Sequence, residues 1–264
     1  MESALEEIEF LALSPNRVRV LELLADGRYT RRELADETGA SQATLGRILG
    51  DFADRSWIVR EDSEYTTTAT GRLVAEGFAD LQEILETEHR LRDIVSYLPT
   101  DHLGFDLRRL SDATITTPSR TRPNAPLTRL LELLEGADEV RTASHAFNEQ
   151  TLRVIEKRTT SGEQAFEGCF SRSAIDALTE AADLRRRLGS VLGSDNATVA
   201  VVDRVPLAVM VVDDVVYLLL RDDQGILRAS VDTDDPEVRS WAEETVERYW
   251  SEAAVLEADD LESA

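Results

Sequence analysis

Basic and hydroxyl side chains gather in two short polar segments between residues 28 and 60, where their chemistry suits a phosphate backbone and base edges. Guanidinium groups and the free N–H groups at a helix start bind phosphate oxygens. Glutamine can form paired hydrogen bonds with adenine, and arginine with guanine. The residues that we expect to contact double-stranded DNA are Arg28, Thr30, Arg31, Arg32, Ser41, Gln42, Thr44, Arg47 and Arg60.

Helix caps and stops position these side chains. Thr30 begins one predicted helix, and Glu33, three residues later, completes a capping box. That helix runs to about Thr38, Gly39 ends it, and Ser41 caps the next helix. Two helices joined by a short turn that contains glycine form the helix-turn-helix pattern, whose second helix enters the major groove of DNA.

A helix precedes this pair, and a hairpin and a long helix follow it. An apolar face at helical spacing predicts the first helix over residues 14–25. Residues of β-type predict strands over 57–60 and 65–68, which would form the wing of a winged helix-turn-helix. A helix is predicted over 72–97, and its apolar positions outnumber what one intrachain face requires. We therefore expect a homodimer joined mainly through that helix.

The charge of the chain bears on this prediction. The formal net charge is -23, which should repel DNA, and on composition alone an acidic protein with no nucleic-acid role is favoured. Only one base, Lys157, is a lysine, and such an acidic, lysine-poor composition is typical of halophilic archaea. At about 1 M salt the Debye length is roughly 3 Å, so the repulsion is largely screened. Residues 28–60 carry a net charge of +1, whereas residues 232–264 carry -10.

Several other chemistries have little support. Cys169 is the single cysteine, so an intrachain disulfide and a cysteine-based metal cage are excluded within one chain. It lies in an apolar strand, where we expect a core residue rather than a redox switch. The histidines show no metal-ligand spacing, and we expect neither a metal nor a cofactor. These histidines are His89, His102 and His145.

Membrane segments are also unsupported. No run of about 18 apolar residues exists, so we expect no membrane-spanning helix. The N-terminal residues are acidic and do not form a signal-peptide pattern. We therefore expect a cytoplasmic protein.

The second half of the chain alternates between strands and helices and then turns to consecutive strands. The predicted strands cover 113–117, 139–143, 165–170, 198–202, 207–212, 215–220 and 226–231. The predicted helices cover 127–134, 148–160, 173–188 and 235–256. Such a pattern indicates a mixed α/β domain with an antiparallel strand meander.

Two parts of the sequence resemble known regulators. The segment RRELADETGASQATLGRILGDFADRSWIVREDSEYTTTATG resembles the winged-helix domain of archaeal regulators related to the ArsR group. The segments DLRRLSDATITTPSRTRPNAPLTRLLELLEGADEVRTASHAFN and VDRVPLAVMVVDDVVYLLLRDDQGILRASVDTDDPEVRSWAEETVERYWSEA resemble the C-terminal effector domain of many haloarchaeal and methanogen regulators, first named for a methanogenesis regulator. The resemblance implies transcription regulation, dimers and an α/β effector domain, but names no effector. The cysteine pairs and histidine clusters of metal-sensing ArsR proteins are missing.

The expected fold class is α/β (α+β): an N-terminal winged helix-turn-helix, a linking helix, and a C-terminal mixed α/β effector domain. The expected domain bounds are 1–71 for the DNA-binding domain, 72–98 for the linking and dimerisation helix, 99–256 for the effector domain and 257–264 for an acidic tail that we expect to be frayed. The alternative for the first domain is a winged helix that serves protein contacts.

A small-molecule site is expected in the C-terminal domain, lined by His145, Asn148 and Arg204. His145 and Asn148 follow a predicted strand and open a helix, a place where loops commonly bind ligands. Arg204 lies in the turn between two apolar strands, and an anionic metabolite would suit it. The alternatives are that residues 144–148 only cap a helix, and that the whole domain is structural.

An enzyme is the hypothesis from another class. The predicted effector domain faintly resembles the phospholipase D architecture, whose chemistry needs a His-x-Lys pair. Phe147 stands where that lysine would follow His145, and the one lysine is Lys157. No phosphate loop, Ser/His/Asp set or metal motif replaces the pair, so we expect no catalytic residues. The function expected from the sequence is that of a DNA-binding transcription regulator that responds to a small-molecule effector.

Overall fold

The computed structural model describes residues 3–262. The chain divides into two compact units, Met1–Glu86 and Thr87–Ala264, and the division falls within a long helix. The first unit has one hydrophobic core, and the second unit has two.

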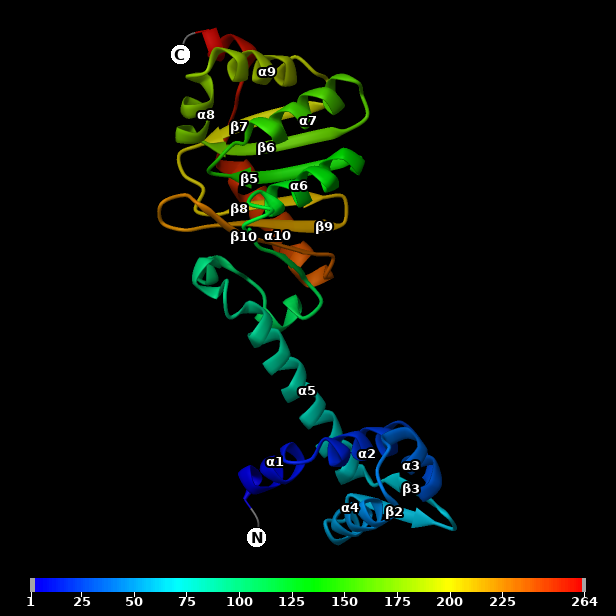
Figure 1. The fold of residues 1–264 in the computed structure, drawn as a ribbon. Coiled ribbons are helices and arrows are strands. Elements are labelled where there is room, and N and C mark those ends of the chain that lie inside the picture. The colour runs from blue at the N-terminus through cyan, green and yellow to red at the C-terminus, as the bar shows by residue number, and fades with distance from the viewer. Residues whose placement is uncertain (1–2, 263–264) are drawn as a thin grey trace. The chain divides into compact units, whose positions relative to one another are not determined.

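The first unit is a winged helix-turn-helix (Figure 1). Its helices are α1 (Ala4–Ala12), α2 (Pro15–Asp26), α3 (Arg31–Thr38), α4 (Gln42–Asp54) and the first part of α5 (Ala69–Leu91). Its strands are β1 (Tyr29–Thr30), β2 (Ile58–Glu61) and β3 (Glu64–Thr67), which form an antiparallel sheet in the order β1-β3-β2. The predicted helix pair and wing are both present.

Local capping explains where α3 and α4 begin and end. The Thr30 hydroxyl accepts a hydrogen bond from the Glu33 N–H, and the Glu33 carboxylate accepts one from the Thr30 N–H at 2.7 Å. Gly39 ends α3 with φ 66°, a left-handed conformation that costs glycine little. The Ser41 hydroxyl then accepts from the Thr44 N–H at 3.1 Å and starts α4.

The helix α1 was not predicted from the sequence. Ser3 and Glu6 form a capping box, and Leu11 is buried against the core of the first unit. Arg17 and Arg55 each lie 3.9 Å from the centre of the Phe10 ring, counted from the guanidinium carbon. Leu11 is the one buried residue in this nine-residue helix, and its apolar neighbours Leu5 and Ile8 are exposed.

Gly71 allows the first turn of α5 to lie directly against the start of the β2–β3 hairpin, at Trp57. The Thr68 N–H donates to the carbonyl of Trp57 at 2.8 Å, and the Thr68 hydroxyl accepts from the Gly71 N–H at 3.0 Å. A Cβ atom on residue 71 would lie 1.8 Å from the Trp57 carbonyl oxygen. Only glycine fits this contact without a backbone shift.

The helix α5 ends at Leu91 rather than at the predicted Tyr97. A turn and a short 3-10 helix, Val95–Tyr97, follow it. In this tighter arrangement Leu91, Ile94 and Leu98 are all buried in one core of the second unit. Burial of these side chains accounts for the change of backbone geometry, which the helical periodicity did not reveal.

The second unit is built on an eight-stranded mixed sheet in the order β11-β7-β6-β5-β8-β9-β10-β4. The strands β5, β6 and β7 pair in parallel, whereas β8, β9 and β10 form the predicted antiparallel meander. The strand bounds are β4 Thr114–Thr116, β5 Glu139–Ser144, β6 Ala165–Ser171, β7 Ala197–Val202, β8 Ala208–Val212, β9 Val215–Arg221, β10 Leu227–Thr233 and β11 Ala254–Val255.

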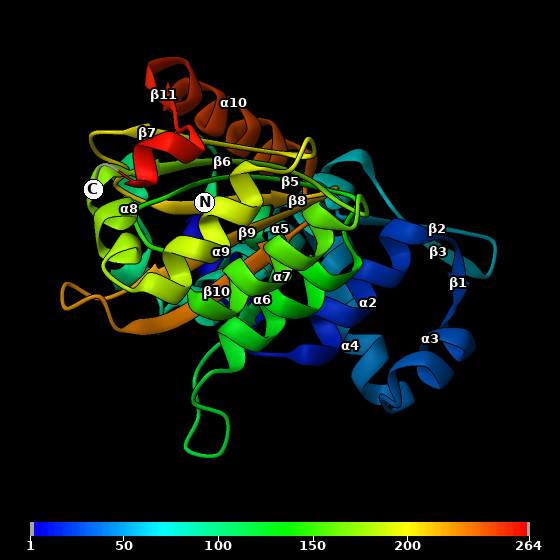
Figure 2. The ribbon, with the colours of Figure 1, turned by 90° about the horizontal axis from the view of Figure 1, so that it is seen from above.

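Helices cover both faces of this sheet (Figure 2). One face carries α6 (Ala125–Gly136), α7 (Glu149–Thr160) and α9 (Ala182–Leu192), and the other carries α10 (Pro236–Glu252). Short 3-10 helices cover Thr100–His102, Leu107–Leu110 and Ala258–Glu262. Two separate apolar clusters fill the two sides of the sheet, so the second unit has a three-layer α/β/α structure.

Two predicted elements differ from the observed ones. The helix predicted over 173–188 is two helices, α8 (Arg172–Thr179) and α9, because the backbone of Ala181 is extended. Leu261, in the segment that was expected to be a frayed tail, is buried in the core beneath α7 and α9. The predicted fold class, an N-terminal winged helix-turn-helix with a mixed α/β domain, is confirmed.

The contact at Gly71 can be tested with a matched glycine on the same helix. Gly71→Ala should destabilise the protein by about 1–3 kcal/mol, because the new methyl group overlaps the Trp57 carbonyl. Gly77→Ala has open space around its Cβ and should stabilise the protein by about 1 kcal/mol through helix propensity. Urea unfolding of both full-length variants measures the two effects. Equal effects of the two substitutions would contradict the contact.

Candidate nucleic-acid interface and ligand pocket

The helix α4 presents a polar face and buries an apolar one. Leu45, Ile48 and Phe52 are buried in the core of the first unit. Gln42 and Arg47 are exposed on the same helix. Arg47 forms no hydrogen bond or ion pair with any residue that the structure describes. Two side chains that can pair with base edges are therefore free on the second helix of the pair.

Arg31 holds the two helices of the pair together. Its guanidinium donates a hydrogen bond to the carbonyl of Gln42 in the first turn of α4. A Cβ atom on Gly46 would lie 2.6 Å from the same guanidinium group, so glycine at this position leaves room for the arginine. Thr30 is likewise used within the unit, as the cap of α3. These two predicted contact residues thus have intramolecular partners, while Arg32 beside them is exposed.

The wing carries the remaining basic residues of the candidate interface. Arg28 forms an ion pair with Glu61 at 2.5 Å. The Nε of Arg60 donates to the carbonyl of Asp62 at 3.1 Å, and the guanidinium lies 5.4 Å from the Tyr65 ring centre. Both arginines are exposed, and their guanidinium groups are held beside the hairpin.

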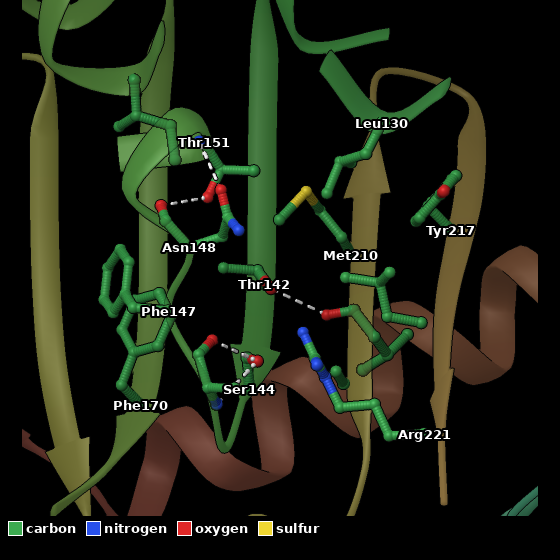
Figure 3. Close-up of a pocket in the computed structure, with 15 residues that line it drawn as sticks. Leu130, Thr142, Ser144, Phe147, Asn148, Thr151, Phe170, Met210, Tyr217 and Arg221 are labelled. Atoms are coloured by element: carbon green, nitrogen blue, oxygen red, sulfur yellow. Dashed lines mark hydrogen bonds between the residues drawn. The ribbon is translucent and has the colours of Figure 1, made fainter. Parts of the chain in front are cut away.

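The second unit contains a pocket between the sheet and the helices α6 and α7 (Figure 3). Its volume is about 40 Å³. The pairing of the strands places Thr142 of β5, Met210 of β8 and Tyr217 of β9 in one row across the sheet, and a second pair, Ala208 and Leu219, in the next row. All five of these side chains line the pocket.

Most polar groups that line the pocket already have partners. The Thr142 hydroxyl donates to the carbonyl of Val209 at 2.8 Å, and the Ser144 hydroxyl donates to the carbonyl of Ala146 at 2.9 Å. The Tyr217 hydroxyl donates to a backbone carbonyl of α6, and burial raises the pKa of Tyr217 above its ordinary value. The hydroxyl hydrogens in the pocket are therefore not available to a ligand.

Asn148 lines the same pocket and also caps α7. Its side-chain oxygen accepts hydrogen bonds from the N–H groups of Gln150 at 2.8 Å and Thr151 at 3.4 Å. The observed hydrogen bonds of Asn148 are therefore those of a helix cap. Phe147, directly before it, stacks on Phe170 with ring centres 3.9 Å apart.

Arg221 is the charged residue of the pocket. It stands at the end of β9, and its guanidinium points toward the part of β5 that holds Thr142 and Ser144 (Figure 3). One of its terminal nitrogens donates to the carbonyl of Gly225 at 2.8 Å, while its buried Nε has no partner within residues 3–262. Burial lowers the pKa of this guanidinium. A half-buried charged group thus forms no ion pair with a carboxylate among the described residues.

A wider hollow of about 330 Å³ adjoins the pocket and shares Arg221, Ala208 and Leu219 with it. His145 lines this hollow, and its buried Nδ1 has no hydrogen-bond partner in the described part of the chain. Burial lowers the pKa of His145, and the positive charge of Arg221 lowers it further, although a hydrogen bond with the backbone of Leu207 opposes the shift.

The three predicted ligand residues do not share one cavity. Asn148 lines the pocket and His145 lines the adjoining hollow, whereas Arg204 is exposed and lines neither. Arg221 was missed by the sequence reasoning. Its position at the end of an apolar strand was visible, but its approach to β5 depends on strand pairing that the sequence does not display.

Residues 3–262 also bear on three other kinds of site: a metal centre, a reactive thiol and a membrane-spanning helix. No group of three or more His, Cys, Asp or Glu side chains there could hold a metal ion. Cys169 is buried, which raises the pKa of its thiol to about 11. Within the same residues, no helix has the length and hydrophobicity needed to cross a membrane.

Two family models match the chain, one in each unit of the fold. Residues 5–90 match a model described as the HVO_A0261 N-terminal domain. Residues 123–252 match the middle domain of the methanogenesis regulatory protein FilR1. The chain resembles a transcription regulator. Neither match bears on the predicted relationship to the ArsR group, which stays a prediction.

Solved structures with a similar arrangement were also found. An archaeal chromatin protein, TrmBL2, is 16% identical, with 94% of this chain and 98% of that chain covered and a TM-score of 0.39. The phospholipase D family member Nuc from Salmonella typhimurium is 10% identical, with 55% and 99% covered and a TM-score of 0.44. NucT from Helicobacter pylori is 13% identical, with 55% and 98% covered and a TM-score of 0.43. These scores are too low to support a functional assignment, and no curated protein matches the sequence.

The environment of His145 predicts its titration. In an NMR pH titration of the full chain, the pKa of His145 should lie below the ordinary value of 6.5. Arg221→Met should raise this pKa because it removes a nearby positive charge, whereas Arg204→Met should leave it unchanged. Since folding favours the neutral imidazole, the shift also removes stability as the pH falls below the pKa of the unfolded chain. A pKa at or above 6.5 would contradict this description.

Proposed function

We propose that this protein is a sequence-specific DNA-binding transcription regulator that acts as a homodimer and responds to a small molecule through its second unit. The observation that carries the DNA-binding part is the exposed polar face of α4, where the side chains of Gln42 and Arg47 form no hydrogen bond or ion pair among the described residues. A helix held in this way can enter the major groove and meet base edges with its N-terminal residues.

The predicted contact residues of the first unit then have different tasks. Gln42 and Arg47 read bases, and the free N–H groups at the starts of α3 and α4 favour phosphates. Arg32 adds a phosphate contact, and Arg28 and Arg60 do so from the wing. Arg31 acts indirectly, since its hydrogen bond to the Gln42 carbonyl fixes the start of α4.

The acidic body of the protein sets the conditions for binding. Its net charge of -23 opposes approach to DNA over long distances, but this repulsion fades as the Debye length shortens to roughly 3 Å at about 1 M salt. Phosphate contacts also weaken as salt rises, whereas direct hydrogen bonds to base edges act at contact and are screened less. We therefore propose that the protein functions in a halophilic cytoplasm, where repulsion is weak and base readout decides the site.

Arg47→Ala tests the assignment of α4. The DNA site is first selected from random duplexes by the full-length protein in molar potassium chloride. The variant should bind that site about 5- to 150-fold more weakly, because base readout by one arginine is worth about 1–3 kcal/mol. Arg204→Ala, an exposed arginine in the second unit, is the matched control and should bind normally. Unchanged binding by Arg47→Ala in fluorescence anisotropy would exclude α4 as the reading helix.

The proposed dimer rests on apolar side chains of α5 that find no cover in the first unit. Leu73 is 69% exposed and Ile84 is 39% exposed. These residues are eleven positions apart, which is about three helical turns, so they lie on one side of the helix. A second copy of the chain is the occupant that we propose, because paired DNA half-sites require a two-fold symmetric protein. The core of the second unit instead buries Leu91 and Ile94, which also lie in the predicted helix 72–97.

The dimer surface is tested by placing charges on it. Leu73→Glu combined with Ile84→Glu should convert the dimer into a monomer at micromolar concentration, because two desolvated carboxylates would face their symmetry mates. Ala79→Glu adds a charge to another exposed side of α5 and should leave the dimer intact. Light scattering in molar potassium chloride distinguishes the two states. A wild-type mass of one chain would remove the dimer from the proposal.

The effector role is supported by the pocket and hollow in the second unit. A purely structural domain would have no need of a charged arginine withdrawn from solvent beside an unfilled pocket. The hollow also touches Tyr97 and Pro99, which belong to the segment that follows α5. A ligand held there would contact the chain between the ligand pocket and the long helix. The families that match the chain are regulatory, and we propose no catalytic activity.

A further inference from the structure

We propose that the pocket at Arg221 binds a small monocarboxylate with a short apolar tail, whose carboxylate meets the guanidinium and whose tail fills the space between the sheet and α6 and α7. This inference rests on the proposed function, because it assigns the chemical class of the effector. It differs from the site expected from the sequence, since Arg221 replaces Arg204 as the residue that binds the anion.

The first argument is the missing partner of Arg221. Acidic residues outnumber basic ones by 52 to 29, and several other partly buried arginines of the second unit pair with carboxylates. Arg129 pairs with Asp232 at 2.7 Å, and Arg187 pairs with Glu156 at 2.5 Å. Arg221 forms no ion pair within the described residues. A withdrawn positive charge is costly unless it is paired, so an external anion is the partner that the site lacks.

The second argument is the geometry of the guanidinium donors. One terminal nitrogen is held by the Gly225 carbonyl, which fixes the direction of the side chain. The buried Nε has no acceptor, although a guanidinium has five N–H donors in a rigid fork. Figure 3 shows the group directed into the pocket rather than away from it. Such a fork suits the two oxygens of a carboxylate.

The third argument concerns the tail. Beyond Arg221 the pocket is lined by apolar side chains, among them Leu130, Ile155 and Met210, and the hydroxyl hydrogens there are already donated to carbonyls. A water molecule needs about 10–15 Å³ of this kind of volume. The pocket volume of about 40 Å³ therefore admits a tail of roughly three or four carbon atoms.

The charges around the hollow favour a monoanion. Asp222 and Asp223 both line it, and the carboxylate of Asp223, which forms no ion pair among the described residues, disfavours a doubly charged phosphate. Asp222 is itself neutralised, since it pairs with Arg228 at 2.7 Å and accepts hydrogen bonds from two backbone N–H groups. Burial and the charge of Arg221 both lower the pKa of His145, which favours its neutral form. Among the residues that line these two cavities, Arg221 is thus the one that presents a positive charge to the ligand.

Calorimetric titration of the full-length protein with isovalerate tests the proposal. Isovalerate has the carboxylate and a branched tail of four carbons, isovaleramide has the same shape without the charge, and octanoate has a tail too long for the pocket. The experiment is done in molar potassium chloride at neutral pH. We expect isovalerate to bind at least 10-fold more tightly than the amide or octanoate. Absence of isovalerate binding at 10 mM, or equal binding of the amide, would overturn the proposal without any variant.

Two substitutions locate the binding. Arg221→Met keeps the unbranched apolar stem and removes the charge, so isovalerate binding should fall at least 10-fold. Arg221→Lys keeps the charge but loses the fork, and it should bind more weakly than wild type. Arg204→Met is the control and should bind as wild type does. Equal affinity of wild type and Arg221→Met would refute the site, and circular dichroism confirms that each variant is folded.

The DNA measurements separate this inference from the proposed function. Arg221→Met should still select and bind the wild-type DNA site, while isovalerate should change the DNA affinity of wild type alone. Carboxylate binding by a protein that selects no DNA sequence would overturn the proposed function and leave the pocket assignment in place. Selective DNA binding with no carboxylate binding would do the reverse.

Discussion

The scarcity of positive charge is the constraint on which the rest of this molecule depends. With nearly two acidic residues for each basic one, most partly buried arginines are held by carboxylates that fasten elements together, as Arg141 does between Glu167 and Glu247. Arginines that stay outside this network are then conspicuous. Arg47 is one such residue on the surface of the first unit, and Arg221 is another inside the second. The same shortage that gives the chain its acidic surface therefore underlies both binding proposals, DNA at Arg47 and a carboxylate at Arg221.

The winged helix-turn-helix was predictable because its signals are local. The capping box at Thr30, the left-handed glycine at residue 39 and the cap at Ser41 each specify a backbone turn within a few residues. The helix α1 was missed although Ser3 and Glu6 form a capping box of the same kind. The end of α5 was misplaced because Ile94 and Leu98 fit a helical pattern, although their burial in the second core is achieved by a tighter turn.

The candidate ligand site illustrates the opposite limit. His145 and Asn148 were found from their place after a strand, but the role of Asn148 in capping α7 uses the oxygen that a ligand would need. Arg221 could not be found, because its meeting with Thr142 and Ser144 requires β8 to lie between β5 and β9. Strand order depends on long-range packing. It brings together residues about eighty positions apart, and no local sequence pattern predicts this proximity.

The solitary thiol in the central sheet has a practical consequence. Cys169 is buried in β6, and the elevated pKa of its thiol leaves almost none of it as the reactive thiolate at neutral pH. Alkylating reagents and spectroscopic labels should therefore pass over the native protein. A cysteine introduced on either unit would be modified alone, so distances between the two units can be followed by spin or fluorescence labels in an otherwise wild-type background. Slow modification of Cys169 itself would report the rate at which the sheet opens.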